Sequence, residues 1–372
     1  MDIITRNFFR LLRAGAFNTD ERIEPMSPWK WRQVYSMSTE HGVGALLSDG
    51  VRRCSSQFYL QLPDDLTTAW QQHVSLTEQQ NRDIYARQSQ LFADYEQLSA
   101  RPILLLSQAV ATLYDHPLHR NPSPIDIYFP FDTQGKRADR WAREHADEIN
   151  DSRRHTLSYT IGGVKAVNHH RIWRLTNKLT DHTLQGIIEK EFRENSARHI
   201  TVNGRRTETI QPTLSLMVML MRIANSIISE GIPLVQLIDL GTFLRKAGDQ
   251  VDFVKIDTWT QQLHLSRMAQ LTGVLLTGLL GFTPDEVPFM TADSDQNIQR
   301  AMQEISRLRK PSDSSADSFR FSQGNGIFVH ATGSSSMLGQ ARRSARYFRY
   351  YPAESITSFF AAFAHSLTHI EE

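Results

Sequence analysis

The feature that most limits the fold is a block of strand-like sequence, residues 101–175, set between two longer stretches with helical spacing. The block opens with the apolar run "ILLL", which is typical of a buried strand, and "AVATLY" then resumes helical spacing. After a stiff proline-rich loop, "IDIYFPF" alternates apolar and polar residues, as a strand does. A charged helix is expected next, over residues 136–150.

A hairpin is predicted to complete this block. In "HTLSYTIGGVKAVNHHRIW", two alternating runs flank the pair Gly162-Gly163. Glycine pairs are favoured in two-residue hairpin turns because these turns need positive φ angles. The order strand, helix, strand, helix and hairpin indicates a small α/β unit.

The two flanking stretches predict helices. "MDIITRNFFRLLRAGAF" has the pattern of an amphipathic helix, and a long helix is expected from Leu62 to Leu98. No strand pattern is found before residue 101, and the chain is predicted to be helical again after Leu175. We therefore predict an α+β fold with a small mixed β-sheet. Its regions are a helical N-terminal region (1–100), an α/β core (101–175), a helical C-terminal region (176–310), a flexible loop (311–326) and a helical tail (327–372).

Charge and cysteine content narrow the class of protein. Lys+Arg number 41 and Asp+Glu 40, so no net field favours nucleic acid or an anionic membrane as a partner. The apolar stretches 214–221 and 271–282 are shorter than the roughly 20 residues that a membrane span needs. The single cysteine, Cys54, allows no internal disulfide and fits a reducing compartment. We expect a cytoplasmic protein with no membrane partner.

Three segments in a fixed order carry a family resemblance. They are "ARPILLLSQAVATLYDHPLHRNPSPIDIYF", "GGVKAVNHHRIW" and "EGIPLVQLIDLGTFL". In this order they resemble an uncharacterised bacterial nucleotidyltransferase family of the DNA polymerase β-like superfamily. That family typically has an "LLKG" strand-to-helix turn, an Arg-x-x-Gly-Asp-Ile-Asp strand, a "vElH" strand and a helical "eGiGLRQl.D" segment. The resemblance extends from "WRQVYSMSTEHGVGALL" to the tail near "RYYPAES".

The resemblance implies a particular chemistry. Nucleotidyl transfer uses metal ions to bridge the nucleotide phosphates and to activate the attacking oxygen. Carboxylates at positions i and i+2 of a strand point to the same face and can hold these metals. A third carboxylate on a neighbouring strand completes the set, and a small-residue turn at a helix N-terminus binds phosphate through backbone N–H groups.

Several of the family positions are changed in this chain. Arg120 and Asp126 are retained, but Ser123 occupies the glycine position and Pro124 the position of the first aspartate. A proline side chain can ligate no metal. Ser107-Gln108 replaces the Lys-Gly of the phosphate turn.

The later motifs are changed as well. Val167 aligns with the family glutamate and His169 with its histidine, although a shift of one residue would place Asn168 at the glutamate position. Neither Val167 nor Asn168 is a carboxylate. In the helical segment, Gln236 and Asp239 are retained.

These positions give the candidate site. Asp126 is the candidate catalytic residue and the candidate ligand for Mg²⁺. The candidate nucleotide-binding residues are Ser107, Gln108, Arg120, Ser123, Gln236 and Asp239. Losses in three motifs at once favour a catalytically degenerate family member that binds a nucleoside triphosphate or a protein partner.

Two alternatives remain open from the sequence. The first is an active enzyme that transfers a nucleoside monophosphate to an unknown acceptor, with Asp126 assisted by Asp115, Asp132 or a substrate phosphate. The second is a scaffold protein that uses its helical surfaces alone.

His155 and His169 could share a metal ion across the hairpin, whereas His169 and His170 should point to opposite faces of their strand. Arginines among aromatic residues in "ARRSARYFRYYP" predict either nucleic-acid contact or a solvated helix face.

Overall fold

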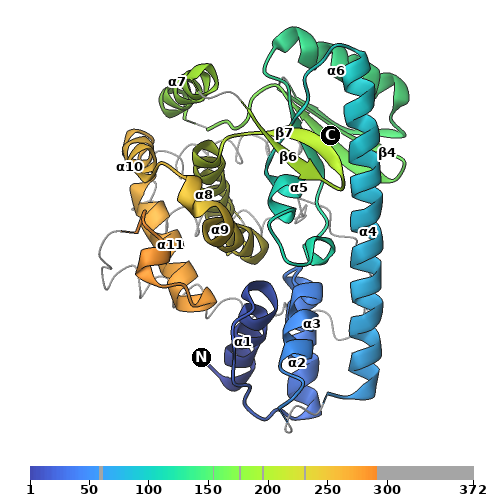
Figure 1. The fold of residues 1–372 in the computed structure, drawn as a ribbon, viewed down its shortest axis with the longest axis vertical. Helices are drawn as coiled ribbons and strands as arrows, with labels where there is room; N and C mark the ends of the chain where they lie inside the picture. The colour runs from blue at the N-terminus through green and yellow to red at the C-terminus, as the bar shows by residue number, and fades with distance from the viewer. Residues whose placement is uncertain (58–61, 154, 176, 195–196, 230–231, 291–372) are drawn as a thin grey trace, which may run out of the picture.

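The computed structural model describes residues 1–57, 62–153, 155–175, 177–194, 197–229 and 232–290. The predicted loop at 311–326, the predicted tail at 327–372 and its arginine-rich segment lie outside these residues. The described chain forms one seven-stranded mixed sheet flanked by helices, which confirms the predicted α+β class (Figure 1).

The N-terminal part is helical, as predicted. Its elements are α1 (Ile3–Phe17), α2 (Pro28–Glu40), α3 (Gly44–Arg53) and α4 (Asp64–Gln97). Helix α4 has 34 residues and spans about 50 Å at the usual rise per residue. It runs along one side of the molecule from the other three helices to the sheet, and so ties the two parts together (Figure 1).

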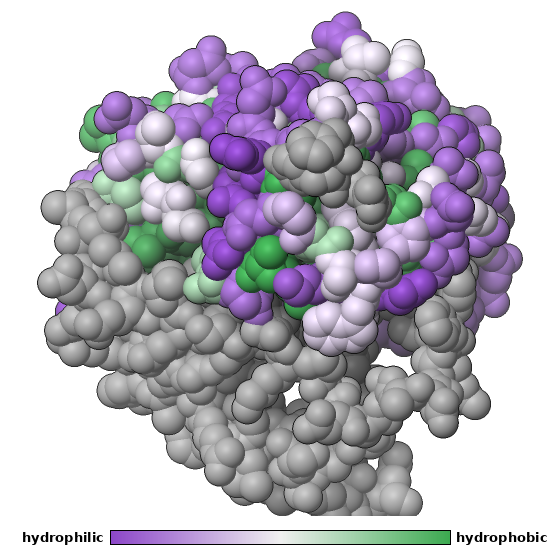
Figure 2. All heavy atoms as spheres, turned by 90° about the horizontal axis from the view of Figure 1, so that it is seen from below, coloured by the Kyte–Doolittle hydropathy of each residue, from purple (hydrophilic) through white to green (hydrophobic). Residues whose placement is uncertain are grey.

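Most large apolar side chains of these helices are buried, although Trp29 on α2 and Leu76 on α4 are exposed. Phe8, Leu12 and Trp31 are at most 1% exposed. Figure 2 shows the end of the molecule at which α1–α3 lie, where hydrophilic residues cover much of the described surface and smaller hydrophobic groups lie between them. The predicted amphipathic character of the first helix is confirmed, with one buried face and one partly exposed face.

The sheet has the strand order β3-β4-β5-β2-β1-β7-β6. Its strands are β1 (Ile103–Leu104), β2 (Ile125–Tyr128), β3 (Glu148–Arg153), β4 (Thr156–Ile161), β5 (Val164–His169), β6 (Arg198–Val202) and β7 (Arg205–Thr209). The central strand β2 is parallel to β5 and antiparallel to β1, and β1 is parallel to β7. The predicted hairpin is β4–β5, and both residues of its Gly162-Gly163 turn have positive φ angles.

Three strands contradict the predicted helices. The helix predicted over 136–150 is α6 (Asp132–His145), and the chain then enters the polar edge strand β3. Strands β6 and β7 lie in the region predicted to be helical after Leu175. That prediction was wrong because "RHITVNGRRTET" alternates around Asn203-Gly204, the residue pair most favoured in a two-residue hairpin turn.

The remaining helices form the C-terminal part and the connections within the sheet. They are α5 (Leu106–Ala111), η1 (Pro117–His119), α7 (Lys178–Glu194), α8 (Pro212–Ser229), α9 (Leu234–Ala247), η2 (Gly248–Gln250), α10 (Phe253–Gln262), α11 (Ser266–Leu280) and η3 (Pro284–Glu286). One core lies between the sheet and helices α4 and α6, and a larger core joins the N-terminal helices to α8, α9 and α11. No helix among the described residues is both long and apolar enough to cross a membrane.

A buried histidine connects the N-terminal helices to the loop that precedes β2. The Nδ1 atom of His119 lies 2.6 Å from an oxygen of Asp49 on α3, and its Nε2 atom lies 3.0 Å from an oxygen of Glu78 on α4. Both ring nitrogens can donate to a carboxylate only in the protonated imidazolium. Hydrogen bonding to Asp49, and to a lesser extent to Glu78, raises the pKa of His119 despite its burial.

This raised pKa predicts a pH-dependent contribution to stability. The folded state binds the His119 proton more tightly than the unfolded chain, whose histidine has a pKa of about 6.5. The stabilisation should be complete below that unfolded pKa and should be lost as the pH rises through the raised folded pKa. Between these two pKa values the free energy of unfolding of the wild type should fall as the pH rises. We expect a smaller fall in His119→Gln, as measured by urea denaturation of both proteins at a series of pH values. Identical pH slopes for both proteins would contradict this expectation.

Candidate functional site

The candidate site is built on one face of the parallel strand pair β2 and β5. Ile125 and Ile127 are fully buried in the core beneath α4 and α6, so Asp126 between them points to the opposite face of the sheet. The strand register pairs Asp126 with Val167 and Tyr128 with His169. Val167 and His169 therefore share the face of Asp126.

Both carboxylate oxygens of Asp126 accept hydrogen bonds from the protein. The Ser107 hydroxyl donates to Oδ2 at 2.9 Å, and Nε2 of His169 donates to Oδ1 at 2.8 Å. Burial acts to raise the pKa of Asp126, but the hydrogen bond and charge of His169, the charge of Arg222 and the Ser107 bond together lower it below its usual value. Asp126 is therefore an ionised carboxylate with a hydrogen-bond donor on each oxygen.

A second buried cluster lies beside the loop that leads into β2. Arg120 and Asp239 form a bidentate ion pair, with Nε–Oδ1 and Nη2–Oδ2 distances of 2.8 Å. The Tyr114 hydroxyl donates to Oδ1 of Asp239 at 2.6 Å, and Nη1 of Arg120 donates to the Ser123 hydroxyl at 2.8 Å. The attraction of Asp239 raises the pKa of Arg120 against the opposing effect of burial. This pair holds the β2 loop against α9.

The predicted residues are thus brought together, with one exception. Ser107 bonds to Asp126, Arg120 bonds to Ser123, and Gln108 donates to the carbonyl oxygen of Ser123 at 3.0 Å. Gln236 instead donates to the Ser226 hydroxyl on α8 at 3.0 Å, outside this network. It is one helical turn from Asp239 on α9, but its side chain makes a different contact.

A family model described as an uncharacterised nucleotidyltransferase matches residues 27–281 of the chain. The protein belongs to this nucleotidyltransferase family. The match includes helices α2–α4, the whole sheet and helices α5–α11. No curated protein and no solved structure matches the chain.

The strand register shows which of the two residues, Val167 or Asn168, faces Asp126. Val167 lies beside Asp126 on the same face, whereas Asn168 points to the other face. There the Asn168 amide oxygen accepts hydrogen bonds from Tyr95 and Tyr159, and its nitrogen donates to Asp139. The β5 position beside Asp126 therefore carries an apolar side chain.

The other carboxylates considered as helpers of Asp126 are engaged elsewhere. Asp115 pairs with Lys246 at 2.9 Å, and Asp132 pairs with Lys136 at 2.6 Å. His170 faces Asp132 and Asp139, on the opposite side of β5 from His169. Among the described residues, no group of three or more His, Cys, Asp or Glu side chains is placed to hold a metal ion.

Sequence reasoning missed two residues that face this site. Tyr114 gives no pattern that would link it to Asp239, 125 positions away along the chain. Arg222, whose charge acts on Asp126, did carry a signal, because it follows the apolar run "LSLMVMLM" of α8. A charged side chain in an otherwise buried helix usually faces a polar partner.

Proposed function

We propose that this protein is a nucleotidyltransferase-family member that binds a nucleotide or a protein partner without metal-dependent transfer. One observation carries the proposal: both oxygens of Asp126 are already bonded, to Ser107 and to His169. A divalent ion would have to share these oxygens with their two donors, and it would gain a single carboxylate. Magnesium is commonly held by one or two carboxylates together with substrate phosphates, so Asp126 alone supplies only the smallest usual number of carboxylates.

The positions of Pro124 and Val167 support the same proposal. Pro124 lies two residues before Asp126, and Val167 lies beside Asp126 in the register. Neither side chain has an atom that can bind a cation. The groups near Asp126 are a hydroxyl, an imidazole and the Arg222 guanidinium, which suit an anion better than a metal ion.

Titration calorimetry with ATP, GTP, CTP and UTP, each with and without Mg²⁺ or Mn²⁺, tests this proposal. We expect any nucleotide binding to change by less than about threefold when metal is added, because Asp126 offers a single carboxylate that already accepts two hydrogen bonds. We also expect no release of pyrophosphate with any of the four nucleotides.

Asp126→Ala and Asp83→Ala provide the matched comparison, since Asp83 is an exposed aspartate on α4. Metal-dependent binding that is lost in Asp126→Ala but kept in Asp83→Ala, together with pyrophosphate release by the wild type, would show an active enzyme and overturn the proposal. Failure of all four nucleotides to bind would leave the protein-partner form of the proposal, to be tested by pull-down with wild type and Asp126→Ala.

A further inference from the structure

Strand β6 forms one edge of the sheet, and in the described chain it pairs with β7 alone. The hairpin of these two strands turns at Asn203-Gly204, and its register pairs Val202 with Arg205. In a two-residue hairpin the residues that flank the turn form a hydrogen-bonded pair, and such pairs then alternate along the strands. The backbone N–H and C=O groups of His199 and Thr201 therefore point outward, away from β7.

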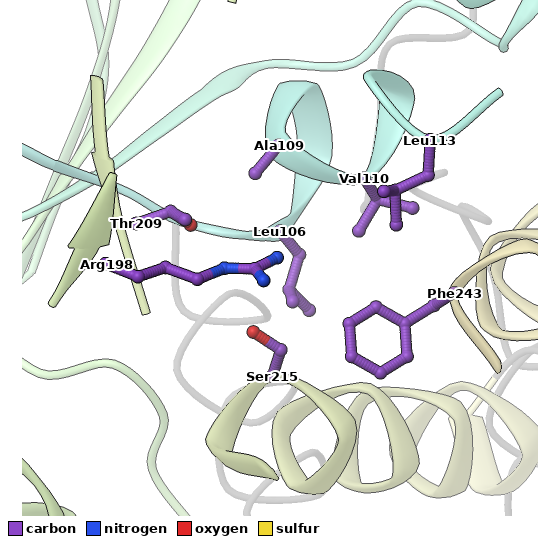
Figure 3. Close-up of a pocket in the computed structure, with 8 residues that line it drawn as sticks. All are labelled: Leu106, Ala109, Val110, Leu113, Arg198, Thr209, Ser215 and Phe243. Carbon is purple, nitrogen blue, oxygen red and sulfur yellow. The ribbon is translucent and has the colours of Figure 1, made fainter. Parts of the chain in front are cut away.

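The described structure leaves this outer side of β6 open. No backbone hydrogen bond from another described segment reaches His199 or Thr201, and both residues are exposed. Arg198, which begins the strand, directs its charge elsewhere. Figure 3 shows its side chain extending between Leu106 and Ser215, away from the row of outward backbone groups. The outward groups are thus a template for one more strand.

The opposite edge of the sheet, strand β3, is protected against such pairing. Its register with β4 shifts between Ile149 and Asp151, and it carries the acidic residues Glu148 and Asp151. Bulges and charged residues are usual protections of an edge strand. Strand β6 pairs with β7 without a shift, and the residues between Arg198 and the turn include no proline, lysine, arginine or acidic residue. One edge of the sheet is therefore blocked and the other is left able to pair.

We propose that β6 is the contact strand of a homodimer, in which the β6 strands of two copies pair antiparallel about a two-fold axis at Ile200. His199 then lies opposite the partner subunit's Thr201, and each such pair exchanges two hydrogen bonds between its outward groups. The Ile200 side chain, partly buried against the core, lies opposite the partner subunit's Ile200. Arg198 lies opposite the partner subunit's Val202, so no two like charges face each other directly.

The pattern of the strand favours a second copy as the occupant. A two-fold interface must be complementary to itself, and an axis at Ile200 pairs both outward residues within the strand. An axis at His199 or at Thr201 would shift the strands by two residues and place one outward residue opposite a position beyond β6. The net charge of +1 per chain opposes association only weakly. Strands β1 and β7 separate this edge from Asp126 on β2, so the inference does not depend on the proposed function.

Sedimentation equilibrium of the full chain at a series of concentrations tests the inference. We expect the mass to rise from the 42.6 kDa of one chain towards twice that value. Thr201→Pro should weaken the dimer by about tenfold or more, because each copy loses one outward N–H donor. Proline is tolerated on an edge strand where its missing N–H would face solvent, so the monomer should still fold. Thr201→Val keeps the N–H group and should dimerise like the wild type.

A pair of charged variants makes the test independent of any folding defect. Ile200→Lys and Ile200→Glu each place like charges opposite one another at the proposed axis, so each variant alone should be monomeric. Mixing the two should restore a dimer, because the opposed charges then attract. Failure of the mixture to dimerise, while each variant alone keeps the circular dichroism spectrum of the wild type, would overturn the inference.

Hydrogen exchange identifies what covers the edge. The amide hydrogens of His199 and Thr201 should exchange more slowly as the protein concentration rises, because only the dimer protects them. Protection that is already complete in the monomer would show that another segment of the same chain covers β6. That result, a mass of one chain at all concentrations up to about 100 μM, or a dimer unaffected by Thr201→Pro would each overturn the inference.

Discussion

Replacing Asp239 with alanine is expected to lower the free energy of unfolding by about 3–5 kcal/mol, the usual cost of breaking a buried ion pair by removing one partner. The side chains of Arg120 and Asp239 are only 7% and 10% exposed. Without Asp239, the Arg120 guanidinium would remain buried and charged, and the Tyr114 hydroxyl would lose its acceptor. Urea denaturation of wild type and variant measures the difference.

Two further variants make this experiment decisive. Asp249→Ala removes an exposed aspartate just beyond α9 and should change stability by less than about 0.5 kcal/mol. Arg120→Met combined with Asp239→Leu removes both charges and should recover most of the loss, because the penalty comes from the unpaired charge rather than from the missing attraction. A loss below about 1 kcal/mol in Asp239→Ala would mean that water reaches Arg120 and that the pair does not fix the β2 loop to α9.

Replacing Gly50 with alanine should be comparably damaging, for a steric reason. A Cβ atom built on Gly50 of α3 lies 1.9 Å from the Leu11 carbonyl oxygen of α1, and one on Gly15 lies 1.9 Å from the Leu46 carbonyl oxygen. The two helices therefore meet through their backbones. We expect Gly50→Ala to cost about 3 kcal/mol, the upper end for overpacking, because a backbone obstacle cannot rotate away as a side chain can.

Gly186→Ala is the matched control for this prediction. Gly186 also lies within a helix, α7, but a Cβ atom there meets nothing within 4 Å. Alanine should stabilise α7 by about 0.5–1 kcal/mol through its better helix propensity. Thermal unfolding of both variants compares the two effects, and a Gly50→Ala protein as stable as wild type would show that α1 and α3 can separate without loss.

Local patterns were sufficient for the long elements of the fold. Helix α4 is predicted from Leu62 to Leu98 and is observed from Asp64 to Gln97, because apolar residues recur on one side of both halves of the helix, with Thr77 and Asn81 buried between them. The β4–β5 hairpin was predicted from the Gly162-Gly163 pair, whose turn conformation requires little beyond the residues themselves. The β6–β7 hairpin carried an equally local signal at Asn203-Gly204 that the helical interpretation overlooked.

Strand β3 could not be found in this way. Its residues, "EINDSR", are mostly polar and show no clean alternation, and the strand lies at the edge of the sheet next to β4. An edge strand is stabilised largely by backbone pairing with its neighbour rather than by burial of its own side chains. Its existence therefore depends on the β4–β5 hairpin being already in place.

The sequence by itself determined which residue types are available at the site. The order of its motifs groups Arg120, Asp126 and Asp239, and Pro124 is a residue without a metal-binding side chain. Tertiary structure decided their partners. Hydrogen bonds between Asp126 and His169 and between Arg120 and Asp239 join residues 43 and 119 positions apart. Such pairs are set by strand register and helix packing, in which a shift of one residue turns a side chain to the other face. That is why Val167 rather than Asn168 lies beside Asp126, and why Gln236, in the same segment as Asp239, bonds to Ser226 instead.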